Sequence, residues 1–406
     1  MHLLQINATA NWGSTGKIAE QINQVAQAHG WKTYIAYGRY ARACQSEVLR
    51  VGGQMDIIRH GIQSLLFDRQ GLASQSATKQ FIEEIDKIRP DVIHLHNIHG
   101  YYINYQILFS YLKRAHIPVV WTLHDCWPFT GHCSHFVTVG CERWKTECHD
   151  CPIKSSEYPK SWLFDRSREN YRLKKETFNG VDNLVIVPVS EWISGLVKES
   201  FLGGYPIKCI HNGIDLRQFV QMGGREENCK KWGIDSKKKI ILGVASVWES
   251  RKGLNDFNTL CTLLGDDFQI VLVGITEKQR NKLPPQIKGI LRTNNVSELA
   301  ELYSAADVYV NPTYADTFPT TNLESLACGT PIVTYRTGGS PEAIDEKTGV
   351  VVDQGDISGL VAAIKSVCEW VGENVSVECR RKAEKEFNKE VQFAKYFDIY
   401  ETIVRN

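Results

Sequence analysis

A buried strand, a polar loop, a helix and a second strand follow one another between Val308 and Tyr335, and this order restricts the fold. Val308 to Thr313 is apolar and rich in β-branched residues, which predicts a buried strand. The polar string DTFPTT follows where a strand would lead into a helix, and ACGTPIV returns the chain to a parallel strand. Because parallel strands need such a crossover, the stretch predicts an α/β fold.

Two acidic residues mark the helix of this stretch. Asp316 precedes the expected helix start, and Glu324 lies about one turn inside the helix. Exposed N–H groups at a helix start bind phosphate, and the residues that offer N–H groups or hydroxyls here are Thr317, Phe318, Thr320 and Thr321. Pro319 offers no N–H. The alternative for an isolated pair of carboxylates is a solvated helix cap.

The N-terminal segment has the same order of strand, turn and helix. His2–Thr9 predicts a first strand, and an amphipathic helix that ends at Gly30 follows it. The turn between them contains Gly13 and Gly16 and would bring backbone amides to the carboxyl edge of a parallel sheet, where anions bind. GSTGK is not a P-loop, because the GxxxxGK[ST] spacing would put Asn11 at the first glycine. A tight turn that requires glycine is the alternative to a binding role.

Two further buried strands, within the ranges Asp91–Gly100 and Pro118–Cys133, each end in histidine. Strands of a doubly wound sheet deliver side chains to a crevice at their carboxyl ends. We therefore expect His96, Asn97 and His124 to point into the same cleft. A lone histidine is usually a core or surface residue, but its repetition at equivalent strand ends favours a binding site.

The chain departs from this pattern between Asp125 and about Lys160, in an excursion rich in Trp, Gly, His and Cys. Its thiols are Cys133, Cys141, Cys148 and Cys151. The Cys148-x2-Cys151 pair has the spacing of half a zinc site, although the other two cysteines are spaced irregularly. Structural zinc therefore competes with free or disulfide-bonded thiols, and other ligands could come from His132, His135 and His149.

Two cations begin the helix that follows the strand Ile240–Ala245, in the string Arg251-Lys252-Gly253. Cations at the mouth of a cleft can neutralise a leaving diphosphate. On charge alone, a solvated pair is the alternative.

A different segment, Gln54 to Asp68, carries apolar residues at helical spacing. We expect it to pack on the sheet, with membrane-surface docking as the alternative.

Composition limits the compartment and the partners. The 406 residues suffice for two domains. A net charge of +1 gives no sign of the excess positive charge that nucleic-acid-binding proteins carry. The sequence has no cationic leader and no run of 18 apolar residues, so we expect a protein that is neither secreted nor membrane-spanning. Twelve cysteines in such a chain are expected to be reduced thiols of a cytosolic protein.

Several of these strings together resemble a known family. The acid-x7-Glu spacing of Asp316 and Glu324 and the strings HLHN, TLHD, NGID, RKG and WPFTGHC are similar to those of glycosyltransferase family 4, which are retaining enzymes with the GT-B fold. The excursion resembles a bacterial subgroup that makes capsular polysaccharide, exopolysaccharide and O-antigen. The resemblance implies two doubly wound Rossmann-like domains facing across a cleft. These would be an acceptor-side domain, 1–200, joined by the terminal helix 388–406, and a nucleotide-sugar domain, 201–387.

The resemblance also implies roles for single residues. Glu324 would hold the ribose hydroxyls of a nucleotide, and Asp316 and His124 would face the sugar as catalytic residues. The other donor contacts would be Gly13, Gly16, Arg251, Lys252, Phe318, Thr320 and Thr321, and the acceptor cleft would contain His96 and Asn97. This chain departs from many members of the family at Ser246, Asp316 and Pro319, which stand in place of arginine, glutamate and glycine.

The implied function is that of a retaining hexosyltransferase of class EC 2.4. It would move a sugar from a UDP- or GDP-sugar to a glycan or lipid-linked oligosaccharide in bacterial surface polysaccharide synthesis, without a cofactor for the transfer itself. We expect a cytoplasmic protein with peripheral contact at the inner face of the membrane. The alternatives are a sugar-nucleotide epimerase or hydrolase on the same fold, which consumes the donor alone, and a nucleotide-sugar-binding module without catalysis.

Overall fold

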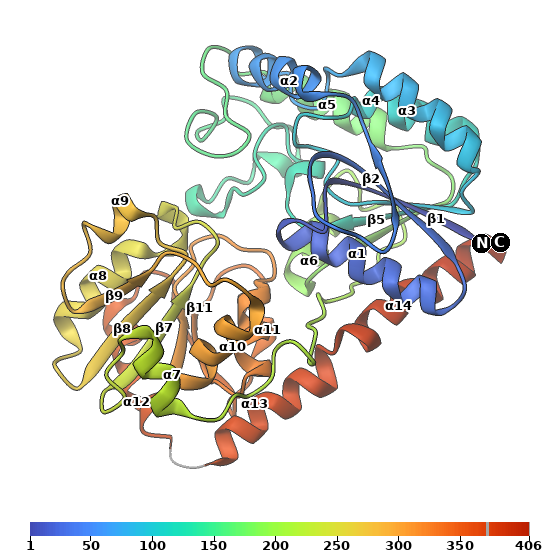
Figure 1. The fold of residues 1–406 in the computed structure, drawn as a ribbon. Coiled ribbons are helices and arrows are strands. Elements are labelled where there is room, and N and C mark those ends of the chain that lie inside the picture. Colours follow the sequence, from blue (N-terminus) through green and yellow to red (C-terminus); the bar gives the residue numbers. More distant parts are fainter. Residues whose placement is uncertain (371–372, 406) are drawn as a thin grey trace. The chain divides into compact units, whose positions relative to one another are not determined.

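The computed structural model describes residues 1–370 and 373–405, so Asn406 of the expected terminal helix and residues 371–372 of the expected second domain lie outside the described part. The chain divides into two compact units (Figure 1). The first contains Met1–His211 and the segment from Glu390 onward, and the second contains Asn212–Lys389.

The first unit is built on a parallel sheet of six strands in the order β3-β2-β1-β4-β5-β6. Their bounds are β1 His2–Ala10, β2 Lys32–Ala41, β3 Glu47–Arg50, β4 Val92–Leu95, β5 Val119–Leu123 and β6 Leu184–Pro188. The strands that the sequence indicates at 2–9, 91–100 and 118–133 correspond to β1, β4 and β5. The strand order reverses between β1 and β4, and ligands of doubly wound folds bind outside the carboxyl ends of strands at such a reversal.

Helices cover both faces of this sheet (Figure 1). They are α1 Gly13–Ala28, α2 Gln54–Phe67, α3 Gln75–Ile88, α4 Tyr105–Ala115, α5 Ser167–Phe178, α6 Glu191–Glu199 and α14 Lys389–Arg405. Alternate strand residues point to opposite faces. Leu3 therefore packs in a cluster with residues of α1 and α14, whereas Leu4 packs in one with residues of α3 and α4.

Helix α2 corrects one expectation from the sequence. Its buried residues are His60 and Ser64, while Met55, Ile58 and Ile62 are exposed. The apolar residues do recur at helical spacing, and Ile57, Leu65 and Leu66 are partly buried, but Ile58, Ile62 and Phe67 are exposed. The expectation of packing on the sheet is therefore wrong for the exposed half of these residues.

The excursion after β5 forms only short 3₁₀ turns, η1 Trp127–Phe129, η2 Val137–Val139 and η3 Arg143–Lys145. It is nevertheless well packed. Trp127, Phe129 and Trp144 are among the largest fully buried side chains of the chain. Aromatic anchors, rather than regular hydrogen bonding, hold the excursion to the unit.

Helix α14 binds the first unit through a buried polar contact as well as apolar packing. His94 of β4 contacts the hydroxyl of Tyr400 through Nδ1 at 2.6 Å and the hydroxyl of Thr122 through Nε2 at 2.7 Å. Thr122 in turn donates to the hydroxyl of Tyr396. His94 Nε2 must therefore carry its proton, and Nδ1 accepts from Tyr400. Burial lowers the pKa of His94 well below its usual value, so the ring is neutral.

The second unit has a parallel sheet of the same connectivity, in the order β12-β11-β10-β7-β8-β9. The strands are β7 Lys239–Val244, β8 Phe268–Val273, β9 Ile287–Ile290, β10 Val308–Asn311, β11 Ile332–Tyr335 and β12 Gly349–Val352. The helices and turns are α7 Arg225–Trp232, η4 Ser250–Lys252, α8 Leu254–Leu263, α9 Glu277–Arg280, α10 Val296–Ala305, α11 Thr320–Ala327, η5 Ser340–Ala343, α12 Ile357–Cys368 and α13 Glu373–Glu386. Here the order reverses between β7 and β10.

The two units divide later along the chain than the boundary at 200/201 expected from the sequence. After α6, Ile207 forms a parallel bridge with Ile186 of β6, and the Ile210 N–H donates to the Pro188 carbonyl at 3.1 Å. This segment extends the edge of the first sheet, so it belongs to the first unit up to His211.

Within the described residues, no helix is both long and apolar enough to cross a membrane.

The contact between His94 and Tyr400 gives a testable prediction. Tyr400→Phe removes the donor to a fully buried acceptor, which should lower the free energy of unfolding by about 1–3 kcal/mol. The matched control is Tyr40→Phe, whose side chain is 52% exposed and whose change should stay within about 0.5 kcal/mol. Urea unfolding followed by tryptophan fluorescence measures both. Equal effects of the two substitutions would contradict the role given to Tyr400.

Candidate functional site

The first unit brings His96 and His124 together at the carboxyl ends of β4 and β5. Each histidine directly follows its strand, and His96 Nδ1 lies 3.0 Å from His124 Nε2. The two rings stack with centroids 5.3 Å apart. Asn97 follows His96, and its N–H donates to Asn7 of β1 at 3.3 Å. The three residues expected in one cleft are therefore neighbours at the reversal point of this sheet.

A chain of hydrogen bonds fixes the tautomers of this histidine pair. The Gln5 side chain donates its NH₂ group to the Ala19 carbonyl at 2.6 Å and to the Asn23 side chain, so its Oε1 must accept from His96 Nε2–H. His96 Nδ1 is then a lone pair that accepts from His124 Nε2–H. His124 is left with Nδ1 as a hydrogen-bond acceptor.

Both rings are neutral at physiological pH. Burial lowers the pKa of His96 well below its usual value and the pKa of His124 to about 4. The neighbouring Asp125 carboxylate raises the pKa of His124, but the effect of burial is larger. A neutral His124 can accept a hydrogen bond from a hydroxyl through Nδ1, and it does not supply a positive charge.

A second contact at these strand ends, between His99 and Asp125, was not singled out from the sequence. His99 Nε2 lies 2.9 Å from Asp125 Oδ2, and its Nδ1 lies 3.1 Å from the hydroxyl of Tyr158 in the excursion. Burial by itself would raise the pKa of Asp125, but His99 and further hydrogen bonds lower it to about 2. The TLHD string, in which Asp125 follows His124, was the signal that could have identified this carboxylate.

Both glycines of the first turn have a structural explanation. Gly13 begins α1 with φ +66°, a conformation that L residues rarely adopt. Gly16 approaches β1 so closely that a Cβ atom would lie 2.6 Å from the Thr9 hydroxyl oxygen. The turn therefore requires glycine at both positions, whether or not it also binds an anion.

In the second unit, the segment Arg251-Lys252-Gly253 is held against the end of β10. A Cβ atom at Gly253 would lie 2.3 Å from the Pro312 carbonyl oxygen, so only glycine permits this approach. The Arg251 carbonyl accepts from the Tyr314 N–H at 2.7 Å, and its guanidinium donates to the Ala315 carbonyl at 3.0 Å. The cations after β7 therefore lie beside the loop after β10.

This approach pairs Lys252 with Asp316, which are 64 residues apart in the sequence. The Lys252 ammonium and the Asp316 carboxylate form a hydrogen-bonded ion pair, and each side chain is only about one-fifth exposed. A separate role was expected for each residue, but no feature of the sequence indicated their contact. The pair places a cation and a carboxylate at the reversal point of the second sheet.

Helix α11 starts next to this pair. Its first residue is Thr320, and Pro319 at the N-cap makes no side-chain cap, so the helix start presents backbone N–H groups and the positive end of its dipole. Thr320 and Thr321 are partly exposed, whereas Phe318 is buried and its ring lies against Phe387 with centroids 5.9 Å apart. Phe318 can therefore contribute only its backbone to an anion.

Glu324 lies in α11, one turn after Thr320. The hydroxyl of Tyr303 donates to Glu324 Oε2 at 3.0 Å and orients the carboxylate. Tyr303 comes from α10 and is fully buried against Tyr309 of β10. This positioning contact was missed, because the sequence places Tyr303 in an ordinary helical pattern.

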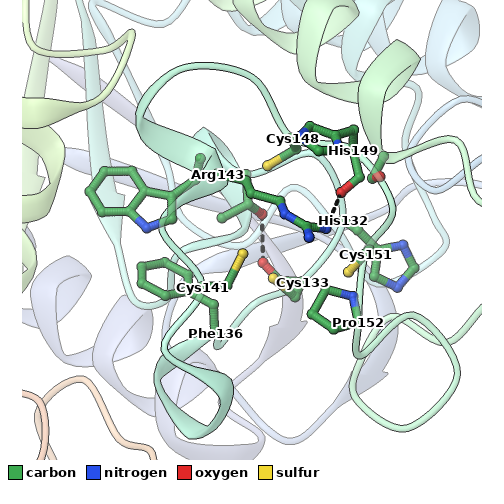
Figure 2. A pocket seen from close by; sticks show the side chains of 12 residues that line it. His132, Cys133, Phe136, Cys141, Arg143, Cys148, His149, Cys151 and Pro152 are labelled. Atoms are coloured by element: carbon green, nitrogen blue, oxygen red, sulfur yellow. Dashed lines mark hydrogen bonds between the residues drawn. The ribbon is translucent and has the colours of Figure 1, made fainter.

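The four cysteines predicted as tentative zinc ligands line one pocket in the excursion (Figure 2). All are free thiols. A hydrogen bond with Cys133 lowers the pKa of Cys151, and the same bond together with burial raises the pKa of Cys133. Among the described residues, no three His, Cys, Asp or Glu side chains are already arranged to hold a metal ion.

Sequence comparisons identify the family. Residues 17–218 match the profile described as Glycosyltransferase Family 4, and residues 224–386 match the profile described as Glycosyl transferases group 1. The putative colanic acid biosynthesis glycosyl transferase WcaC of Escherichia coli (strain K12) is 23% identical over 423 residues, which cover 99% of this chain and 100% of WcaC. The N,N'-diacetylbacillosaminyl-diphospho-undecaprenol alpha-1,3-N-acetylgalactosaminyltransferase of Campylobacter jejuni is 24% identical over 205 residues, which cover 48% of this chain and 54% of that protein.

A solved structure shows the same fold. Anabaena HepE in complex with UDP-glucose superposes with a TM-score of 0.67 at 15% identity, and the match covers 100% of both chains. The predicted fold class, two doubly wound α/β units of the GT-B type, is confirmed by this likeness and by the two parallel sheets. With two family profiles matching most of its length and a relative aligned from end to end, the chain belongs to glycosyltransferase family 4 and is a glycosyltransferase.

Proposed function

We propose that this glycosyltransferase is retaining and moves a hexose-type sugar from a UDP- or GDP-sugar to a glycan or lipid-linked oligosaccharide in bacterial surface polysaccharide synthesis. The observation that carries the proposal is the Lys252–Asp316 ion pair beside the uncapped start of α11, at the reversal point of the second sheet. The relative WcaC is named for colanic acid biosynthesis, and the Campylobacter relative is named for a diphospho-undecaprenol acceptor.

The donor would lie along the second unit. Arg251, Lys252 and the N–H groups of Thr320 and Thr321 would receive the diphosphate, since cations and a helix start both favour anions. Glu324, oriented by Tyr303, would accept hydrogen bonds from ribose hydroxyls. HepE, which shares the fold, is solved with UDP-glucose, and this supports a nucleoside-diphosphate sugar as the donor class.

Retention would proceed on one face of the donor sugar, with a donor phosphate oxygen taking the proton of the acceptor hydroxyl. The bond from the anomeric carbon to the diphosphate breaks as the bond to the acceptor oxygen forms, and no side-chain nucleophile takes part. The pairing of Asp316 with Lys252 supports this, because a neighbouring ammonium weakens a carboxylate as a nucleophile. Asp316 and His124 would instead position the sugar, which in comparable sites contributes about 10- to 1,000-fold each.

An exposed apolar surface on the first unit supports access to a lipid-linked acceptor. It consists of α2 and the loop 162–164, and its exposed apolar residues are Met55, Ile58, Ile62, Phe67, Trp162, Leu163 and Phe164. The Trp162 N–H donates to the Leu65 carbonyl at 2.7 Å, and the rings of Phe67 and Phe164 lie 5.8 Å apart, so the two elements are contiguous.

Exposed cations flank this surface, namely Arg59, Arg69, Lys160 and Arg166. Apolar side chains bordered by cations suit the interface of an anionic bilayer. The surface would hold the protein peripherally at the inner face of the cell membrane, where a lipid-linked acceptor is presented to a cytoplasmic enzyme.

Donor binding tests the first part of the proposal. Nucleotide sugars of the UDP, GDP, ADP and CMP classes are added at about 100 times their dissociation constants, where a bound ligand stabilises the protein by about 2.7 kcal/mol. We expect a melting shift with the UDP or GDP class. Glu324→Ala should weaken binding by about 10- to 150-fold, the loss of a charged hydrogen bond, while Glu384→Ala on exposed α13 should not.

No shift with any nucleotide sugar would contradict the donor site, and equal shifts in both variants would contradict the role of Glu324. Turnover then separates the remaining functions. Transfer to an acceptor extract supports the proposal, donor loss without an acceptor indicates an epimerase or hydrolase, and binding without turnover indicates a binding module.

Vesicle binding tests the second part. The triple substitution Trp162→Ser, Leu163→Ser and Phe164→Ser removes three exposed apolar side chains and should reduce cosedimentation with anionic phospholipid vesicles at least about tenfold, because each buried apolar side chain contributes about 1.5–3 kcal/mol. The control is Leu263→Ser, since Leu263 is a similarly exposed residue of the second unit. Unchanged binding of the triple variant would exclude this surface as the docking site.

A further inference from the structure

The excursion after β5 encloses a pocket that no step of glycosyl transfer uses. Its cavity volume is about 20 Å³, and the residues around it include Cys133, Cys141, Cys148, Cys151 and His132 (Figure 2). A cavity of about 10–15 Å³ accepts one water-sized particle. The pocket is therefore too small for a sugar or a nucleotide, but it has room for one ion between four thiols.

Backbone groups already prepare two of these sulfur atoms to carry negative charge. The Gly131 N–H donates to Cys148 Sγ at 3.2 Å, and the Ile153 N–H donates to Cys151 Sγ. Hydrogen bonds from N–H groups favour a thiolate over a thiol. Thiolate is the form in which cysteine binds metal ions.

Arg143, which also lines the pocket, holds the turn between Cys148 and Cys151. Its guanidinium donates to the carbonyl of His149 (Figure 2). It also donates to the carbonyl of Asp150, the other residue between these cysteines. The Thr130 hydroxyl donates to the Cys133 carbonyl at 2.6 Å and orients the opposite side of the pocket. The chain thus fixes the backbone of three of the four cysteines before any ion is bound.

His132 provides a second, independent sign of a ligand. Its side chain is 1% exposed, and its Nδ1 lies 2.7 Å from Asp68 Oδ1. Its Nε2 is buried at the pocket and has no hydrogen-bond partner within the described part of the chain. A histidine that ligates a metal through one ring nitrogen commonly donates the other ring N–H to a carboxylate.

We propose that Cys133, Cys141, Cys148 and Cys151 bind one structural Zn²⁺ ion in this pocket, which His132 also lines. Zinc prefers four tetrahedral thiolate ligands in structural sites, and a Cys-x2-Cys pair is a frequent half of such a site. Binding is balanced as Zn²⁺ plus four thiols giving a tetrathiolate complex of net charge −2 plus four protons released to water. No oxidant or reductant takes part.

The structure shows what must change when the ion binds. Cys133 and Cys151 share a thiol hydrogen bond, and the four sulfurs do not yet surround one point. The thiols must lose their protons and rotate toward the cavity centre. Lys174 is fully buried beside this pocket and donates to the carbonyl of Thr130, a residue that lines it.

The site would act as a crosslink for a segment that has almost no regular structure. The excursion contains only 3₁₀ turns, and zinc binding supplies folding free energy directly in such segments. Tyr158, which contacts His99 at the strand ends, lies at the end of the same excursion. The inference is independent of the donor, the acceptor and the stereochemistry of transfer.

Metal analysis of the full-length protein, purified without chelator, tests the proposal. We expect about one equivalent of zinc per chain by inductively coupled plasma mass spectrometry. Replacement by Co²⁺ should give thiolate-to-cobalt charge-transfer absorption and the intense d–d bands of a tetrahedral site. Cys148→Ser should reduce the zinc content at least tenfold, whereas Cys261→Ser, a partly exposed thiol of the second unit, should leave it unchanged.

Zinc-free protein with four reduced thiols, or with a disulfide among them by mass spectrometry after thiol alkylation, would overturn the proposal. If Cys148→Ser fails to fold, the wild-type zinc content and cobalt spectrum still decide the question. Cys141→Ser tests the fourth ligand separately. A cobalt spectrum of unchanged charge-transfer intensity in this variant would exclude Cys141 as a ligand.

Discussion

The reversal of strand order within each parallel sheet is the constraint on which the candidate binding edge of each unit depends. The neighbouring strands at the reversal are β1 and β4 in the first unit and β7 and β10 in the second. In doubly wound folds the connections that follow two such strands run to opposite faces of the sheet, which leaves a crevice at the carboxyl ends of the strands. His96 follows β4, and Lys252 and Asp316 follow β7 and β10. The same connectivity thus places a binding edge in each unit, and glycines such as Gly253 allow the loops to approach one another there.

The two edges differ in their electrostatics, and the difference fits the proposed chemistry. The first edge has two neutral histidines, and the hydrogen bond from His96 to Gln5 determines the tautomer of both rings. His124 Nδ1 can therefore accept a hydrogen bond from a hydroxyl group. The second has cations and a helix start, which suit a diphosphate. At each edge one carboxylate is held by a basic side chain, since Asp125 contacts His99 and Asp316 contacts Lys252. This arrangement favours transfer by positioning over a covalent glycosyl–enzyme intermediate.

The central strands and the residues at their ends could be predicted from the sequence, because buried parallel strands are continuous apolar runs. The order of the strands within each sheet could not. The edge strands β3 and β9 were missed, since EVLR and IKGI are short and half polar. Contacts such as Gln5–His96, between residues 91 positions apart, have no local signal at all. The α2 error has another cause. Helical periodicity reveals an apolar stripe at Met55, Ile58 and Ile62, but not what covers it.

The anomeric configuration of the product tests the central claim most directly. The enzyme is incubated with the nucleotide sugar that it accepts and with its acceptor. Proton NMR of the product then reports the coupling constant of the new anomeric proton. The account predicts that the product keeps the anomeric configuration of the donor and that Asp316→Asn lowers kcat without trapping a glycosylated protein. A product of inverted configuration, or a covalent sugar on Asp316, would contradict it.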